Sequence, residues 1–192
     1  MSKPEQNAAH LPRKPQLFGD RLIGAARLRP AAYEDVEADT SATPQAAIVV
    51  CLSAVSLAIG ESRAGFALVG YSIFRELVAW LLWSGITYVI GAKLLRGKAT
   101  WGELLRTVGF AQAPRLLYAL RVVTILDAPV QYAVTTWKLL AVIVAIRQAL
   151  DFDEARWSNS KAVLTAGLGF VAYVSFALLE ALLFGRAMAP PW

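Results

Sequence analysis

The chain has 192 residues, of which 57% are hydrophobic and only 17% are charged, and its mean hydropathy is +0.49. About a quarter of the residues in a typical soluble domain are charged. This composition therefore excludes an ordinary soluble domain and indicates a chain that lies in lipid. The net charge of +5 does not indicate nucleic acid, because the basic residues flank apolar blocks and do not alternate with exposed aromatic residues. Anionic lipid is the better partner for these charges.

The first 43 residues form a polar segment ahead of the first long apolar block. They contain no apolar core followed by a cleavage site, so no signal peptide is expected. Residues 17–29 predict an amphipathic helix with basic residues toward the edges of its apolar face, a pattern typical of a helix that lies on anionic headgroups. We expect it to bind the membrane surface through Phe18, Arg21, Leu22, Arg27 and Arg29.

Five apolar segments approach the roughly 20 residues that a helix needs to cross a bilayer. They cover residues 44–60, 68–92, 104–126, 129–148 and 162–184. The third contains Pro114 near its middle, and a kink is expected there. The sequence therefore predicts an all-α polytopic membrane protein, with five transmembrane helices in residues 44–192 and an N-terminal interfacial helix in residues 1–43.

Basic residues gather on one side of this five-span map, and the positive-inside rule places that side in the cytoplasm. The other side receives Arg63, Arg75, Arg121 and Arg186. This distribution predicts a cytoplasmic N-terminus and an external C-terminus. The basic residues on the cytoplasmic side are Lys3, Arg13, Lys14, Arg21, Arg27, Arg29, Lys93, Arg96, Lys98, Arg106, Arg147, Arg156 and Lys161.

Charged residues inside the apolar blocks are candidate functional groups, because a charge in the middle of a bilayer costs on the order of 3 kcal/mol even on the lenient insertion scale. One interpretation is an ion or proton path. The other, which we favour, is an ion pair that locks helices together or side chains that reach the membrane edge. Lys138 and Glu180 lean toward a common depth, since side chains tilt toward the N-terminus of their helix. The candidates are Arg75, Glu76, Arg115, Lys138 and Glu180.

Catalytic and cofactor motifs are missing from the sequence. The single histidine, His10, lies in the polar N-terminal segment, which excludes haem or chlorophyll held by membrane histidines and a zinc site of the HExxH type. The apolar blocks contain no pair of aspartates of the kind that intramembrane aspartyl proteases use. We therefore expect no enzyme activity, no cofactor and no metal.

Small residues recur at four-residue spacing in several apolar blocks, and such faces let helices approach closely in lipid. Packing inside the bundle and contact with another protein are equally good interpretations. The pairs are Ala54 with Ala58, Gly109 with Ala113, and Ala162 with Ala166.

Three stretches of the chain resemble the YIP1 family: residues 18–39 (FGDRLIGAARLRPAAYEDVEAD), 100–117 (TWGELLRTVGFAQAPRLL) and 136–150 (TWKLLAVIVAIRQAL). The GFAQAP element after a short basic loop is similar to the bacterial branch. The resemblance implies five spans in residues 44–192, a cytosolic N-terminus and a short C-terminus on the far side. Eukaryotic members act in endoplasmic reticulum and Golgi trafficking as binders of small GTPases, but the short N-terminal segment here departs from their pattern, so GTPase binding is not expected.

These features together predict a protein of the bacterial inner membrane that serves as a scaffold or accessory subunit. Its expected partners are anionic lipids and other integral membrane proteins, in a respiratory or photosynthetic complex for example. The alternative is a small ion or solute transporter or channel that uses the intramembrane charges and the Pro114 kink, because discontinuous helices line solute paths.

Overall fold

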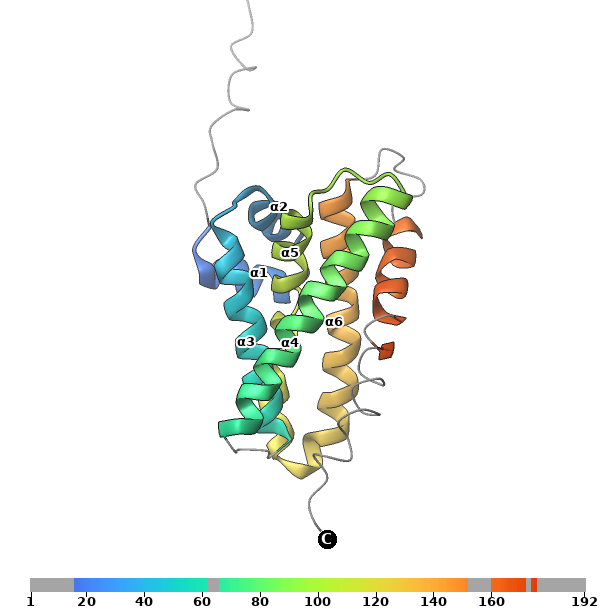
Figure 1. Cartoon of the computed structure of the whole chain (residues 1–192). Coiled ribbons are helices and arrows are strands. Elements are labelled where there is room, and N and C mark those ends of the chain that lie inside the picture. The colour runs from blue at the N-terminus through green and yellow to red at the C-terminus, as the bar shows by residue number, and fades with distance from the viewer. Residues whose placement is uncertain (1–15, 62–65, 152–159, 172–173, 176–192) are drawn as a thin grey trace, which may run out of the picture.

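A computed structural model describes residues 16–61, 66–151, 160–171 and 174–175, and this part of the chain contains helices and no strand (Figure 1). Two short helices come first, and a bundle of longer helices follows. The elements are α1 (Phe18–Ala26), α2 (Pro30–Ala38), α3 (Ala42–Gly60), α4 (Phe66–Thr87), the π-helix η2 (Tyr88–Leu94), α5 (Trp101–Phe110), the 3-10 helices η3 (Ala113–Val122) and η4 (Thr124–Leu126), and α6 (Asp127–Leu150). The all-helical class is confirmed for the described residues.

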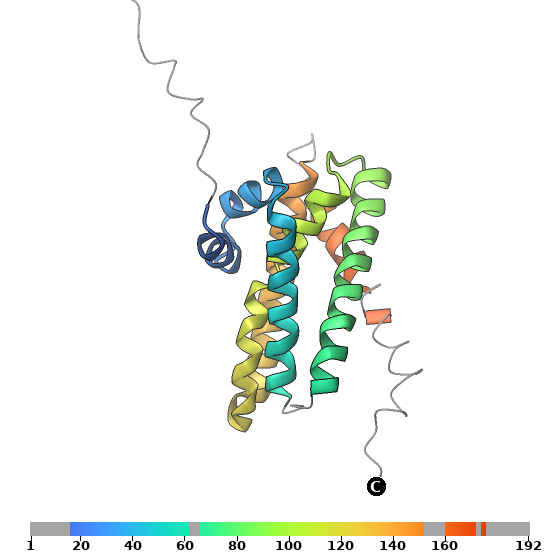
Figure 2. The ribbon, with the colours of Figure 1, turned by 60° about the vertical axis from the view of Figure 1, so that its left-hand side comes forward.

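Successive long elements run in opposite directions along the bundle. α3 leaves the end at which α2 lies, α4 returns to it, α5 and η3 descend again, and α6 returns (Figures 1 and 2). We call the two extremities the α2 end and the opposite end. Of the described helices, three are long and apolar enough to cross a membrane, at Ala42–Gly60, Val69–Leu94 and Thr124–Leu150. A shorter apolar helix covers Ser160–Val171, and the rest of the expected fifth span lies largely outside the described residues.

The expected third span is not one continuous helix. α5 begins with a capping box, in which Thr100 accepts a hydrogen bond from the Glu103 amide and the Glu103 side chain accepts one from the Thr100 amide. It ends at Phe110, because Pro114 has no amide hydrogen to donate to the carbonyl of residue 110. A ten-residue 3-10 helix follows, which is long for this geometry. The expected kink is thus a change of helix type between Phe110 and Ala113.

Helix α3 supports the 3-10 segment. The Ser56 hydroxyl donates to the Leu116 carbonyl (2.5 Å) and accepts from the Ala119 amide (3.2 Å), so one side chain satisfies two backbone groups of η3. Gly60 permits the close approach, because a Cβ there would lie 2.1 Å from the Tyr118 carbonyl oxygen. The packing of α3 therefore favours the tighter helix.

The small-residue pairs lie inside the bundle. A Cβ on Gly109 would stand 2.7 Å from the Ala46 Cβ, so α5 and α3 touch at this position. The alanines of the three pairs are also buried, which assigns these faces to internal packing and removes them as docking surfaces. They are Ala54, Ala58, Ala113, Ala162 and Ala166.

Candidate functional site

Helix α1 packs on the protein's own bundle. The Phe18 ring meets the Phe110 ring edge-on with centroids 6.1 Å apart, and Leu22 packs against the same core. The Trp137 indole donates to the Ala26 carbonyl (2.7 Å), which ties the end of α1 to α6. Phe18 and Leu22 are thus half-buried against the bundle core, and contact of their remaining surface with the membrane stays a prediction.

Arg21 is removed from the expected membrane-binding set, because its side chain is only 1% exposed. Its guanidinium donates to Asp35 (2.6 Å), Asp39 (2.6 Å) and the Gln45 amide oxygen (3.0 Å). These bonds join α1 to α2 and to the start of α3. The hydrogen bond from Ser41 first, and the bond from Arg21 second, lower the pKa of the Asp39 carboxyl to about 2. Of the expected basic surface residues, Arg27 and Arg29 remain exposed.

The intramembrane charges of α4 and η3 form one buried cluster. Glu76 accepts from Arg75, its neighbour on α4 (3.0 Å), and from Arg115 on η3 (2.5 Å). The side chains of Glu76 and Arg115 are 4% and 3% exposed, so this ion pair is shielded from both solvent and lipid. The sequence identified all three residues, with Arg75 and Glu76 as neighbours, but did not predict that Arg115 pairs with Glu76.

Lys138 lies beside this cluster, with its ammonium 4.7 Å from the centre of the Trp83 ring. The interaction between a cation and an aromatic face helps to hold a charge that is otherwise costly away from water. Glu180, its expected partner, lies outside the described residues, so that pair stays a prediction.

Three side chains stand in a column along η3. The guanidinium groups of Arg115 and Arg121 lie 5.6 and 5.7 Å from the Tyr118 ring, one on each side in sequence. Residues three apart align in a 3-10 helix, whereas they diverge in an α-helix. Arg121 continues the column to Asp127 (2.6 Å). In the sequence, these polar residues recur at three-residue spacing, but they do not align on one face when the segment is interpreted as an α-helix.

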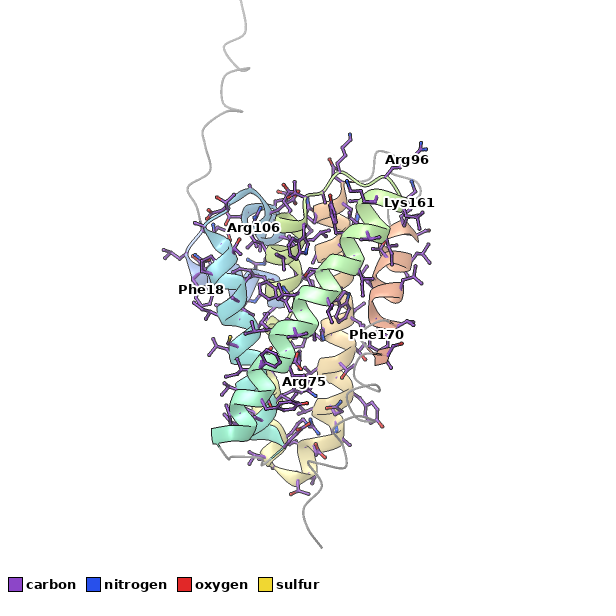
Figure 3. The ribbon with its side chains drawn as sticks, viewed as in Figure 1. Phe18, Arg75, Arg96, Arg106, Lys161 and Phe170 are labelled. Carbon is purple, nitrogen blue, oxygen red and sulfur yellow. The ribbon has the colours of Figure 1, made fainter. Side chains whose placement is uncertain are left out.

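A cavity of about 190 Å³ lies between η3, α6 and the helix Ser160–Val171. This last helix contributes Phe170, which is labelled in Figure 3. On α6, Gln131, Thr135 and Lys138 follow the i, i+4, i+7 spacing of one helix face, a signal that the sequence analysis missed. The Tyr118 and Thr135 hydroxyls share a hydrogen bond (2.9 Å), while the Gln131 Oε1 atom is buried without a hydrogen-bond partner. The lining residues are Arg115, Tyr118, Gln131, Thr135, Lys138, Leu139, Phe170 and Val174.

At the α2 end, Arg106 of α5 holds the last turn of α2. Its guanidinium donates to the Val36 carbonyl (3.0 Å) and to the Glu37 carbonyl. Burial first, and then the negative charges of Glu103 and Asp151, raise the pKa of the Glu37 carboxyl to about 7. Glu34 adds to this effect and Arg106 opposes it.

The raised pKa of Glu37 gives a prediction for stability. Its ordinary value is 4.5, so between about pH 4.5 and 7 the unfolded chain releases a proton that the folded chain keeps, and stability falls as the pH rises through this window. Glu37→Gln should abolish this decline and raise the melting temperature at pH 8. Thermal unfolding in detergent, followed by tryptophan fluorescence, measures it. The control Asp20→Asn, on the exposed side of α1, should keep the decline. An unchanged decline in Glu37→Gln would contradict the assignment.

The described residues contain no candidate metal centre. No three His, Cys, Asp or Glu side chains there lie close enough together to hold a metal ion. His10 lies outside those residues. The ion-paired interior and the apolar helices instead define a multi-pass α-helical membrane protein.

The chain belongs to the YIP1 family, since the model of the Yip1 domain matches residues 28–179. The match confirms the resemblance, and it begins at Leu28, within the N-terminal segment that we expected to be separate from the membrane domain. The family is in general a non-enzymatic membrane protein family. No curated protein and no solved structure matches the chain.

Proposed function

We propose that this protein is a non-enzymatic scaffold or accessory subunit that docks, through the outer face of α4, against a transmembrane helix of another integral membrane protein. The observation that carries this is a stripe on α4 in which two large apolar side chains lie between two glycines. Phe74 and Leu81 are large exposed hydrophobic residues, and a Cβ added to Gly70 or Gly85 would meet nothing within 4 Å.

The presence of glycine at positions 70 and 85, inside a helix, requires an explanation. Glycine in a helix interior costs about 1 kcal/mol relative to alanine. At Gly60 and Gly109 the close approach of another element explains the choice, whereas Gly70 and Gly85 face open space. At about 100° per residue, Gly70, Phe74, Leu81 and Gly85 fall within about 60° of one another. Small residues in lipid are the places where helices approach closely, so this stripe favours a partner helix.

Photocrosslinking in native membranes tests the proposal. A photoreactive residue at position 81 should give a heterologous crosslink, which Gly85→Leu should abolish by blocking the approach of the partner helix. Gly167→Leu is the matched control, because Gly167 also faces open space but lies on the helix Ser160–Val171. A crosslink that survives Gly85→Leu would contradict docking at this stripe. A crosslinked species of twice the mass of the chain would replace the heterologous partner with a second copy.

We further propose five spans in the bacterial inner membrane, with the α2 end in the cytoplasm and the C-terminus outside. The alternating directions of the helices and the basic residues at the α2 end, among them Arg96 and Lys161, support this orientation (Figure 3). Arg27 and Arg29 would then meet anionic headgroups. A reporter active only outside the cytoplasm should work after Trp192 and fail after Lys98, and activity after Lys98 would overturn the topology.

Transport is a second candidate function, favoured by the cavity beside Lys138. Discontinuous helices such as α5 and η3 line solute paths in transporters. This candidate requires a proton or small-ion flux in reconstituted vesicles that Lys138→Met abolishes. Wild-type vesicles without such a flux would leave the scaffold as the function.

A further inference from the structure

The cavity between η3, α6 and the helix Ser160–Val171 has two chemically different parts. Its polar part comprises the Arg115 guanidinium, the Lys138 ammonium and the Tyr118 and Thr135 hydroxyls. Leu139, Phe170 and Val174 form the apolar part. Val174 is also partly exposed, so the apolar part of the cavity extends to the surface of the described bundle there. An occupant with a polar head and an apolar remainder matches this division.

The two cations define the charge of the occupant. Both are largely buried, with Arg115 at 3% and Lys138 at 7% exposure. A guanidinium binds a phosphate or carboxylate through parallel hydrogen bonds, and an ammonium adds a point charge. Glu76 balances part of this charge, but the described cluster holds three cations, Arg75, Arg115 and Lys138, to this one carboxylate, so an anionic group suits the polar part of the cavity.

Gln131 adds a second requirement. Its Oε1 atom is buried without a hydrogen-bond partner, and leaving a buried acceptor in this state destabilises the fold. An occupant that satisfies it must donate a hydrogen bond next to its anionic group. A phosphate that carries a glycerol or ethanolamine unit has both groups.

The size of the cavity limits the occupant. Its volume of about 190 Å³ exceeds the roughly 150 Å³ of a protein cavity that binds benzene. This admits a phosphate with a short polyol or amino-alcohol and excludes a nucleotide. Lys138 lies about halfway along α6, and its side chain leans toward the helix N-terminus, where Gln131 lies. The polar part thus extends from mid-depth toward the opposite end.

We propose that this cavity binds the headgroup of a glycerophospholipid, with its phosphate at Arg115 and Lys138, its hydroxyl or ammonium donating to Gln131, and its acyl chains leaving past Phe170 and Val174. A free phosphate ester would present the same phosphate group to Arg115 and Lys138. The apolar part of the cavity and its opening at Val174 favour the lipid source.

Two measurements on the full chain in mild detergent test the proposal. Mass spectrometry of the purified protein should find phospholipid retained by the wild type and by the control Leu140→Met, an exposed position on α6. Lys138→Met and Gln131→Leu should lose it. In the second measurement, short-chain phosphatidylglycerol should raise the melting temperature of delipidated wild type, because a ligand that binds only the folded state stabilises it. For Gln131→Leu the same shift should require about tenfold more lipid.

Gln131→Leu leaves both cations in place, so the proposal stays testable even where Lys138→Met does not fold. Equal lipid retention by Gln131→Leu and Leu140→Met would overturn the site. Glycerol phosphate or inorganic phosphate that stabilises the wild type as well as the short-chain lipid does would assign the cavity to a free phosphate. A solute flux through delipidated protein that added lipid leaves unchanged would assign it to transport.

Discussion

Gly60→Ala should destabilise the bundle by about 3 kcal/mol, although the change adds one methyl group. The new Cβ would lie 2.1 Å from the Tyr118 carbonyl oxygen and 3.0 Å from its carbonyl carbon, which are backbone atoms that no rotamer change moves. α3 and η3 would have to separate, and the Ser56 hydrogen bonds to Leu116 and Ala119 would lengthen. Unfolding by a denaturing detergent measures the free energy.

The control for this change is Gly85→Ala, since a Cβ there meets nothing within 4 Å. It should stabilise the helix slightly, because alanine is the better helix former by about 1 kcal/mol. Equal effects of the two substitutions would show that the close contact between α3 and η3 does not determine stability.

Arg115→Met should cost about 3 to 5 kcal/mol of unfolding free energy, because it leaves the buried Glu76 carboxylate without its 2.5 Å partner. Replacing both groups, as Arg115→Met with Glu76→Gln, should restore most of this loss, since a buried ion pair exchanged on both sides is often nearly neutral. The four chains of the double-mutant cycle, unfolded under one set of conditions, give the coupling free energy.

A substitution of Arg75 shows whether the stability comes from the Glu76–Arg115 ion pair alone or from every charge in the cluster. It also bonds Glu76 but is 30% exposed, so Arg75→Met should cost much less than Arg115→Met. Additive effects of Arg115→Met and Glu76→Gln would mean that the two residues stabilise the fold through other contacts.

The sequence predicted the long helices well, and the reason is local. A run of apolar residues must be helical in lipid whatever its neighbours are, so α3, α6 and the continuous segment of α4 with η2 extend only about two residues beyond the expected bounds. The helix type of the third span could not be predicted from local sequence alone. Whether residues 113–122 are α or 3-10 depends on Ser56 and Gly60, which lie some sixty residues earlier and act through space.

The candidate site was predicted in part, for a similar reason. A misplaced charge is conspicuous in an apolar run, and Glu76, Arg115 and Lys138 were found in this way. Gln131 and Thr135 are ordinary neutral residues whose importance depends on the cavity they face. For α1, periodicity revealed an apolar face, but a helix of this kind has the same pattern whether that face meets lipid or protein. The partners of Arg21 were needed to decide.

The 3-10 geometry of η3 also determines how far the chain reaches. A residue advances about 2.0 Å in a 3-10 helix and about 1.5 Å in an α-helix, so the ten residues of η3 cover about 5 Å more than they would as α-helix. The same residues in α geometry would draw the turn before α6 inward by nearly one helical turn and leave Arg121 and Asp127 nearer the hydrocarbon. The thickness of bilayer that this protein matches is therefore set in part by the helix type of a single segment.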